Sequence, residues 1–329
     1  MLPGGHCGHD MRLPATLLGT LIALSACAGP QDPGVLQDLR NESAANGLAL
    51  MMMGDQHPIV IPFDSEERRL DLSHLGAVPE VLSASGRVIG WYRALSPMDI
   101  LAAAHAPDPL EALQSELVIR STEGKVVARR RFLGNITLMA LNEETRRLAL
   151  ASDSSREYPR GGTYWQSFDF SSGGFVDDAV ARAEWSPDGA ALAYQKADEI
   201  RVFDVAKGYS RGLTKGTLQA WSPNGKWIAL QSPDRRAALV TPEGVPVDWP
   251  LSQHHIACCL SWSPDGRFVS FDESVEIPLL FAYQRPVVCR VTDGACTSMT
   301  KAPVGLRWIV NYRSLSSSLP GAESPIEKE

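Results

Sequence analysis

The densest group of reactive side chains is the run from His254 to Cys259, HHIACC, which holds two imidazoles and two thiols. Imidazole and thiolate are ligands that zinc and other transition metals bind in proteins. Adjacent residues of a strand point to opposite faces, however, so at most half of these groups can share one face without a bend. We therefore expect no metal cofactor at His254, His255, Cys258 and Cys259. The two cysteines are either a vicinal disulfide or two buried free thiols.

A second pair of cysteines, Cys289 and Cys296, lies on either side of Asp293-Gly294. That arrangement is typical of a strand, a turn and a returning strand, so the two sulfurs would face each other across a hairpin. We predict a disulfide between them, which stabilises the fold by about 2 to 3 kcal/mol on the chain-entropy estimate. Paired cysteines of this kind indicate an oxidising compartment.

Signatures of catalysis and of nucleic-acid binding are weak. The chain has no H-E-x-x-H helix and no phosphate-binding glycine loop. Asp188 and Asp265 lie in turns, where bonding to the backbone accounts for them. A formal net charge of −7 gives no electrostatic reason for binding nucleic acid. We therefore assign no catalytic residue and no nucleic-acid partner.

The element that positions these groups is a five-residue pattern, Trp-Ser-Pro-Asp/Asn-Gly, which occurs three times and is followed each time by an alternating apolar run. Proline presets the turn, serine and aspartate bond nearby backbone, and glycine relieves the exit, so the pattern predicts a hairpin corner with a core tryptophan on the incoming strand. Its structural residues are Trp185, Pro187, Asp188, Gly189, Trp221, Pro223, Gly225, Trp262, Pro264, Asp265 and Gly266.

The copies are spaced by 221 − 185 = 36 and 262 − 221 = 41 residues, near the roughly 40 to 45 residues of a four-stranded propeller blade. These segments resemble the repeats of TolB-type, WD-repeat-like β-propellers, and the copy from Trp185 to Thr214 follows that pattern through four strands. The resemblance implies an all-β, single-propeller fold. It implies little about function, because the family includes scaffolds, transport accessories and the propeller halves of peptidases.

Degenerate copies begin near Leu82 and Leu141, and a last strand is expected at Leu306 to Val310. Three further strands between Leu48 and Leu72 lack the tryptophan motif. Joining the last strand to these three gives a complete sheet, and propellers avoid a free edge in this way. We predict six four-stranded blades, closed by pairing of the N-terminal and C-terminal strands.

The N-terminus indicates export. Arg12 precedes an apolar run from Leu13 to Leu24 that is too short to span a membrane and is typical of a signal peptide. The following Leu24-Ser25-Ala26-Cys27 resembles the bacterial lipobox, which implies a lipidated Cys27; ordinary cleavage after Ala26-Cys27-Ala28 is the alternative. Because Ala28 follows the cysteine, the resemblance implies the outer membrane, facing the periplasm.

The composition of the remaining segments sets the domain boundaries. We expect a signal peptide at 1–26, a lipidated cysteine and tether at 27–45, the propeller at 46–313 and a disordered tail at 314–329. The two short segments at 27–45 and 314–329 are rich in Pro, Gly and Ser with little apolar periodicity.

One insertion, Ala94 to Ser115, exceeds what a blade needs. Ser96-Pro97 and Asp108-Pro109 are typical helix starts. Its apolar residues are candidates for binding a partner, although they could equally pack on the propeller rim. These candidates are Ile100, Leu101, Leu110 and Leu113.

The sequence is compatible with two classes of function. The first, which we favour, is a non-enzymatic envelope scaffold that binds an unidentified envelope protein or another ligand. The second is a propeller enzyme, of the hydrolase or lyase type, with a metal or carboxylate site on one face of the ring.

Lipidation of Cys27 is directly testable. Acyl chains contribute about 0.8 kcal/mol per buried methylene, so the protein should stay with the membrane fraction through a high-salt wash. Cys27→Ser should release it into the soluble periplasmic fraction. Wild-type protein found wholly in that soluble fraction would contradict the lipid anchor.

Overall fold

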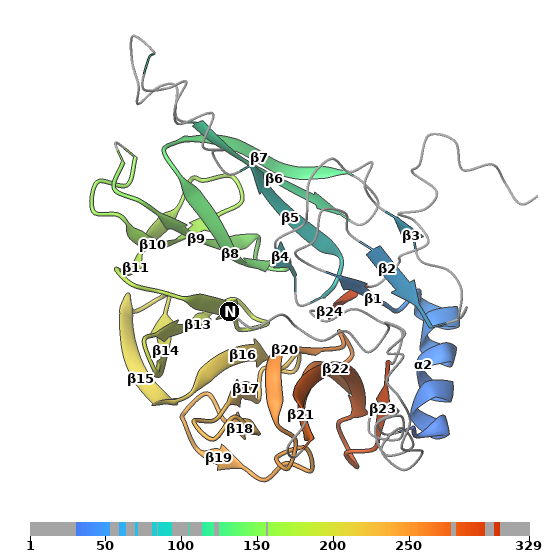
Figure 1. The fold of residues 1–329 in the computed structure, drawn as a ribbon. Coiled ribbons are helices and arrows are strands. Elements are labelled where there is room, and N and C mark those ends of the chain that lie inside the picture. The colour runs from blue at the N-terminus through green and yellow to red at the C-terminus, as the bar shows by residue number, and fades with distance from the viewer. Residues whose placement is uncertain are drawn as a thin grey trace, which may run out of the picture.

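The computed structural model describes residues 31–52, 59–63, 70–71, 81–83, 85–93, 105, 114–121, 125–155, 157–277, 281–299 and 306–309. Within these residues the chain forms twenty-four strands and one helix (Figure 1). The strands make six separate four-stranded antiparallel sheets. The first strands of successive sheets contact one another around the centre of the ring.

Five of the sheets are repeated blades, each built from four consecutive strands. The two blades nearest the N-terminus are β4 (Val81–Leu82), β5 (Val88–Arg93), β6 (Gln114–Ser121) and β7 (Val126–Leu133), then β8 (Ile136–Asn142), β9 (Arg147–Ser152), β10 (Gly162–Ser167) and β11 (Gly173–Asp177). These are the two degenerate copies, and they form complete sheets without the tryptophan motif.

The other three blades carry the clear copies of the motif. They are β12 (Arg182–Trp185), β13 (Ala191–Lys196), β14 (Glu199–Asp204) and β15 (Tyr209–Lys215); β16 (Thr217–Trp221), β17 (Ile228–Gln231), β18 (Ala237–Val240) and β19 (Pro246–Val247); and β20 (Ile256–Trp262), β21 (Phe268–Ile277), β22 (Phe281–Arg290) and β23 (Cys296–Ser298).

The remaining sheet joins the two ends of the described chain. Its strands, in spatial order, are β24 (Leu306–Ile309), β1 (Ala49–Met52), β2 (Ile59–Pro62) and β3 (Leu70–Asp71). β24 pairs antiparallel with β1, placing Trp308 opposite Leu50. The indole N–H of Trp308 also donates to the carbonyl of Ser261 in β20, at 3.1 Å. This sheet is therefore tied to the neighbouring blade.

The three corners share one hydrogen-bond pattern. In each, the serine hydroxyl oxygen accepts the backbone N–H five residues later, at 2.9 Å for Ser186, Ser222 and Ser263 alike. The glycine that leaves the corner has positive φ, 65° at Gly189 for example, a conformation that other residues adopt only with strain. The preceding tryptophan is buried in every case. The motif therefore sets the end of each first strand and fills the space beside it.

The prediction of a tether extending to Ala45 is wrong for residues 33–45, which belong to helix α2 (Pro33–Asn46) on the outer rim beside β23 (Figure 1). Asp32 caps the helix by accepting the backbone N–H groups of Gly34 and Val35, at 2.8 and 3.0 Å. Val35 and Leu39 are buried in a cluster that includes Trp308. The domain therefore begins before residue 46.

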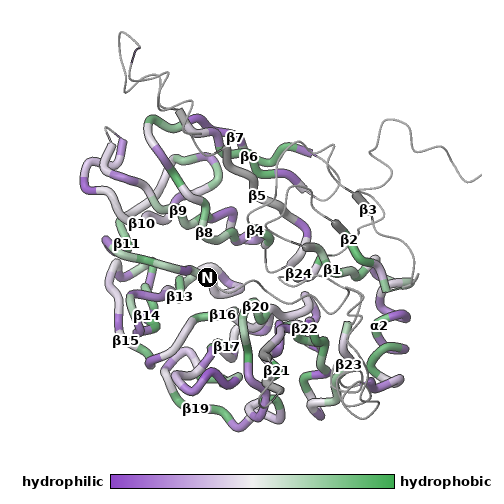
Figure 2. Tube along the Cα trace, viewed as in Figure 1, coloured by the Kyte–Doolittle hydropathy of each residue, from purple (hydrophilic) through white to green (hydrophobic). Residues whose placement is uncertain are grey.

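Ion pairs also hold α2 to the blade of β20–β23. Arg290 binds Asp38 and Arg267 binds Glu42, each at 2.7 Å. Hydrophobic and hydrophilic residues alternate along the helix in Figure 2, and only a few of them are apolar, which explains why the sequence pattern failed to predict it.

In the part of the chain that the structure describes, no helix combines the length and the apolar content that crossing a bilayer requires.

Several predicted features lie outside the described residues. They are the signal peptide, Cys27, the tail after residue 313, and the four apolar residues of the insertion, Ile100, Leu101, Leu110 and Leu113.

The structure predicts that Trp308 is essential for stability. Trp308→Ala should lower the free energy of unfolding by about 3 to 5 kcal/mol, because the side chain is only 3 % exposed and packs between β1 and the adjacent blade. Urea unfolding followed by circular dichroism measures this. Tyr209→Ala is the control, since Tyr209 is 50 % exposed and should change stability by less than about 0.5 kcal/mol. Equal stability of the two variants would contradict this packing role.

Candidate functional site

The blade of β20–β23 contains both pairs of cysteines. Cys289 in β22 lies directly opposite Cys296 in β23, and the two sulfurs are joined in a disulfide. Cys258 and Cys259 in β20 are also joined, as a vicinal disulfide. Of the two alternatives for this pair, the structure therefore has the linked form. A sulfur of the vicinal pair lies 3.1 Å from a carboxylate oxygen of the buried Asp272.

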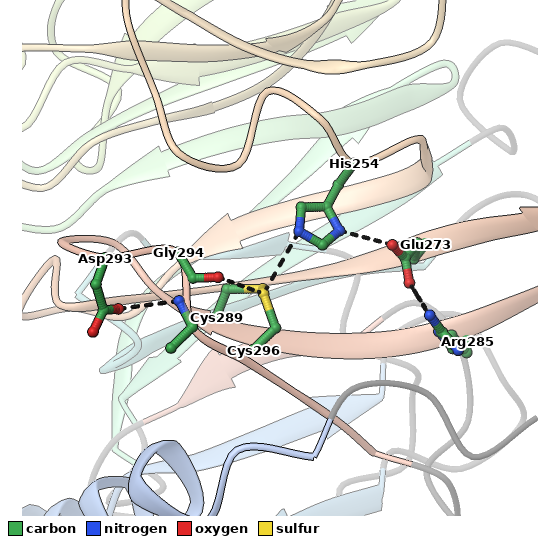
Figure 3. The surroundings of a disulfide bond; sticks show 8 residues. His254, Glu273, Arg285, Cys289, Asp293, Gly294 and Cys296 are labelled. Carbon is green, nitrogen blue, oxygen red and sulfur yellow. Dashed lines mark hydrogen bonds and ion pairs between the residues drawn. A yellow bond between two sulfur atoms is a disulfide. The ribbon is translucent and has the colours of Figure 1, made fainter.

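A histidine supported by two charged side chains stands over the Cys289–Cys296 disulfide (Figure 3). His254 Nδ1 lies 2.7 Å from Glu273 Oε1, and Arg285 Nε donates to Glu273 Oε2 at 2.8 Å. The other ring nitrogen of His254, Nε2, faces Cys296 Sγ at 3.8 Å. The ring of Phe271 packs edge-on against the imidazole. These contacts fix the orientation of the imidazole.

Glu273 is ionised in this arrangement. Burial alone would raise its pKa, but hydrogen bonds from His254 and Arg285 and the charge of the arginine outweigh burial and hold the pKa of the carboxyl below its usual 4.5. The β21–β22 strand pairing places Glu273 directly opposite Arg285, which brings the two side chains into contact.

The structure does not gather the four groups of the HHIACC run. Among the described residues, His254 lies with Cys289 and Cys296, whereas Cys258 and Cys259 lie with Asp272. His255 is exposed. The strand register shifts on both sides of Cys258, which separates the sulfurs from the imidazoles.

The centre of the ring holds a cluster of charged side chains that the sequence analysis missed. Arg182 and Glu184 come from β12, and Arg307 comes from β24. These two strands are separated along the ring by β16 and β20, yet the charge of Arg307 acts on Glu184. Side chains from well-separated blades that interact in this way must extend toward the centre.

Glu184 is the unusual member of this cluster. Burial raises its pKa from 4.5 to about 7, and the charges of Arg307 and Arg182 offset burial only in part. Burial also lowers the pKa of Arg307, whose guanidinium donates to the carbonyl of Leu260 at 3.0 Å. Arg182 donates to the carbonyl of Leu218 at 3.2 Å. Each arginine therefore donates to a backbone carbonyl, and each guanidinium has further N–H donors.

This cluster was not predicted from the sequence, because Arg182 and Glu184 alternate with the buried Ala183 and Trp185, as on any half-exposed strand. Their place on the first strand of a blade, which is the innermost strand, is the sequence signal that could have identified them.

One further pattern, Gly208-Tyr209-Ser210-Arg211-Gly212, has the G-x-S-x-G form of a hydrolase nucleophile turn. The structure places Tyr209 to Gly212 in β15, the outermost strand of its blade. A nucleophile turn requires a sharp strand-to-helix bend, which an edge strand does not provide.

Two cavities open between blades. One of about 560 Å³ lies between the blades of β8–β11 and β12–β15 and includes Asp153, Thr163 and Asp178. Another of about 430 Å³ lies between the corners at Asp188 and Asn224. Neither includes the charged residues at the centre of the ring.

No protein-family model matches the chain, and no curated protein matches it by sequence. Among solved structures, the chain is similar to a protein assigned as a TolB from Agrobacterium tumefaciens, with 13 % identity, a TM-score of 0.50, and coverage of 76 % of this chain and 87 % of the other. The chain is thus a β-propeller of repeated blades.

Two weaker similarities are to an oligogalacturonate lyase in complex with manganese and to hydrazine synthase of Kuenenia stuttgartiensis. The lyase has 13 % identity, a TM-score of 0.38 and coverage of 68 % of this chain and 72 % of the other. The synthase has 12 % identity, a TM-score of 0.40 and coverage of 66 % and 64 %.

The raised pKa of Glu184 predicts a specific pH dependence of stability. The folded state keeps the proton between pH 4.5 and about 7, whereas the unfolded state releases it near 4.5, so stability falls as pH rises through this window. Glu184→Gln should remove this slope and be more stable than wild type at pH 8 by about 1 to 3 kcal/mol. Urea unfolding at pH 5 and pH 8 measures it. Glu144→Gln, at an exposed position, is the control. An unchanged slope in Glu184→Gln would contradict the assignment.

Proposed function

We propose that this protein is a non-enzymatic scaffold of the bacterial envelope that binds an acidic segment of a partner protein at the centre of the ring. The observation that carries the proposal is the cluster of Arg182, Glu184 and Arg307. Arg182 and Arg307 bring two positive charges to the cluster, where Glu184 has a raised pKa and Asp272 also acts on Arg307. A carboxylate from a partner would complement the positive charges and accept the remaining guanidinium donors.

A closed ring would suit this use of the centre. We propose that the sheet of β24 and β1–β3 acts as a sixth blade and that the β1–β24 pairing closes the propeller. The closed ring would hold Arg307 rigidly opposite Glu184, since β24 carries the arginine. Preorganised donors bind a ligand at a lower entropic cost than mobile ones.

The envelope location rests on two kinds of support. The N-terminal sequence resembles a lipoprotein signal that ends at Cys27. The described residues also contain two disulfides, and disulfides persist mainly in oxidising compartments. We propose lipid anchoring at the outer membrane, facing the periplasm, with the propeller at residues 33–313.

The insertion at Ala94 to Ser115 is a second binding element in this proposal. It joins β5 to β6, so extra chain length is attached to a rigid sheet, where binding residues are often found. Ile100, Leu101, Leu110 and Leu113 would supply apolar contacts to the same partner.

The alternative of a metal-dependent enzyme has less support. Metal ligation by cysteine needs a thiolate, and the sulfurs of both potential ligand groups among the described residues are joined in disulfides.

Cross-linking in cells tests the proposed function. Arg182→Ala should weaken partner capture by about 10-fold or more, because removing one partner of a buried charge pair costs about 2 kcal/mol or more. Replacing residues 96–113 by a short Gly-Ser turn should leave a folded propeller that loses cross-links. Arg129→Ala is the control, since this side chain is 60 % exposed on β7. An unchanged set of cross-linked proteins in both variants would contradict the proposal.

A further inference from the structure

We infer that His254, Cys289 and Cys296 form a zinc site when the Cys289–Cys296 disulfide is reduced. The potential ligand atoms of these three residues all lie within 4.8 Å of one another. The site is distinct from the charged cluster at the centre of the ring, and the inference does not depend on the proposed function. The donor atoms are suitably spaced, the imidazole is held by Glu273, the site is buried, and reduction of the disulfide frees both thiols.

The spacing suits a tetrahedral metal ion. With zinc–sulfur bonds of about 2.3 Å and zinc–nitrogen bonds of about 2.0 Å, neighbouring ligand atoms of a tetrahedral site lie about 3.5 to 4 Å apart. Nε2 of His254 is already 3.8 Å from Cys296 Sγ. The two cysteines are directly opposite each other in the β22–β23 pair, so breaking the bond between the sulfurs lets them separate to this spacing without moving the strands.

The histidine is held as a metal ligand usually is. Metal-binding histidines generally donate their second ring N–H to a carboxylate, which fixes the ring and its tautomer. Here Glu273 Oε1 lies 2.7 Å from Nδ1, and the other ring nitrogen, Nε2, faces the sulfurs (Figure 3). Arg285 in turn holds Glu273 through two nitrogens, at 2.7 and 2.8 Å.

The surroundings favour retention of the ion. Cys289 is fully buried and Cys296 is 7 % exposed, while Phe271 covers one side of the imidazole. A dry, apolar wall around two thiolates and an imidazole strengthens their attraction for a divalent cation. His254 is partly exposed and forms the side of the site nearest to solvent. The fourth position of the tetrahedron would be taken by water.

Opening the site is a two-electron step. A dithiol donor attacks one sulfur, the Cys289–Cys296 bond breaks, and a mixed disulfide forms. The second thiol of the donor then attacks the donor sulfur of the mixed disulfide and displaces the cysteine. The donor leaves as an internal disulfide, and both cysteines become thiols. Zinc replaces one proton on each thiol and releases two protons as it binds two sulfurs and His254 Nε2.

Zinc binding to the full-length chain tests this inference. To isolate the pair, Cys7, Cys27, Cys258 and Cys259 are replaced by serine, and the disulfide is reduced with a trialkylphosphine, which becomes the phosphine oxide with oxygen from water. The reduced protein should bind one zinc ion and the oxidised protein should not. Glu273→Gln should weaken binding by about 10- to 100-fold, and His254→Ala should weaken it further. The matched control is His255→Ala, at the exposed neighbouring position, which should bind as before.

A cobalt spectrum provides a measurement that does not depend on any histidine variant folding. Cobalt added to the reduced protein should show thiolate-to-metal charge transfer and the strong visible bands of tetrahedral coordination. Octahedral cobalt without charge transfer would overturn the inference. So would zinc uptake by the oxidised protein, or equal loss of affinity in His254→Ala and His255→Ala.

Discussion

Among the described residues, the apolar faces of neighbouring blades cover one another, because the buried clusters that these residues form join two sheets. Ala193, Ile200 and Val202 of one blade pack with Trp221 and Ile228 of the next. Trp262 and Val269 pack in the same way against Leu239 of the preceding blade. Since no blade can cover itself, the ring depends on its ends meeting, and the proposed closure by β1 and β24 meets that need.

The same packing leaves room for charge on the first strands. Ala183 and Trp185 of β12 pack with the preceding blade, while Arg182, which alternates with them, reaches the carbonyl of Leu218 in the next blade. The carboxyl of Glu184 on the same strand is costly to ionise, and its pKa of about 7 reflects that cost. A fold does not need such a residue for packing, which is why we propose a binding role for the cluster.

Features governed by local geometry were predictable from sequence. The corner motif, the hairpin around Asp293-Gly294 and the repeat spacing each follow from turn chemistry over a few residues. Helix α2 was not predicted because it buries only three residues, Val35, Leu39 and Ser43, and so has a narrow apolar face. Its Asp32-Pro33 start is a local signal that the sequence does contain.

The two candidate clusters require contacts that no local pattern contains. His254 meets Cys296 across 42 positions, and Arg307 acts on Glu184 from β24, the last described strand. The run HHIACC instead suggested one local group, and shifts of register in β20 divide it between two environments.

Native-state hydrogen exchange tests the closed ring most directly. If β1 and β24 close the propeller, the amides of Ala49–Met52 and Leu306–Ile309 should exchange only through the same global opening that exposes β20 and β21. Their opening free energies should agree with the free energy of unfolding measured in denaturant. Exchange of β24 at the rate of an unstructured peptide, while β20 and β21 remain protected, would contradict the account.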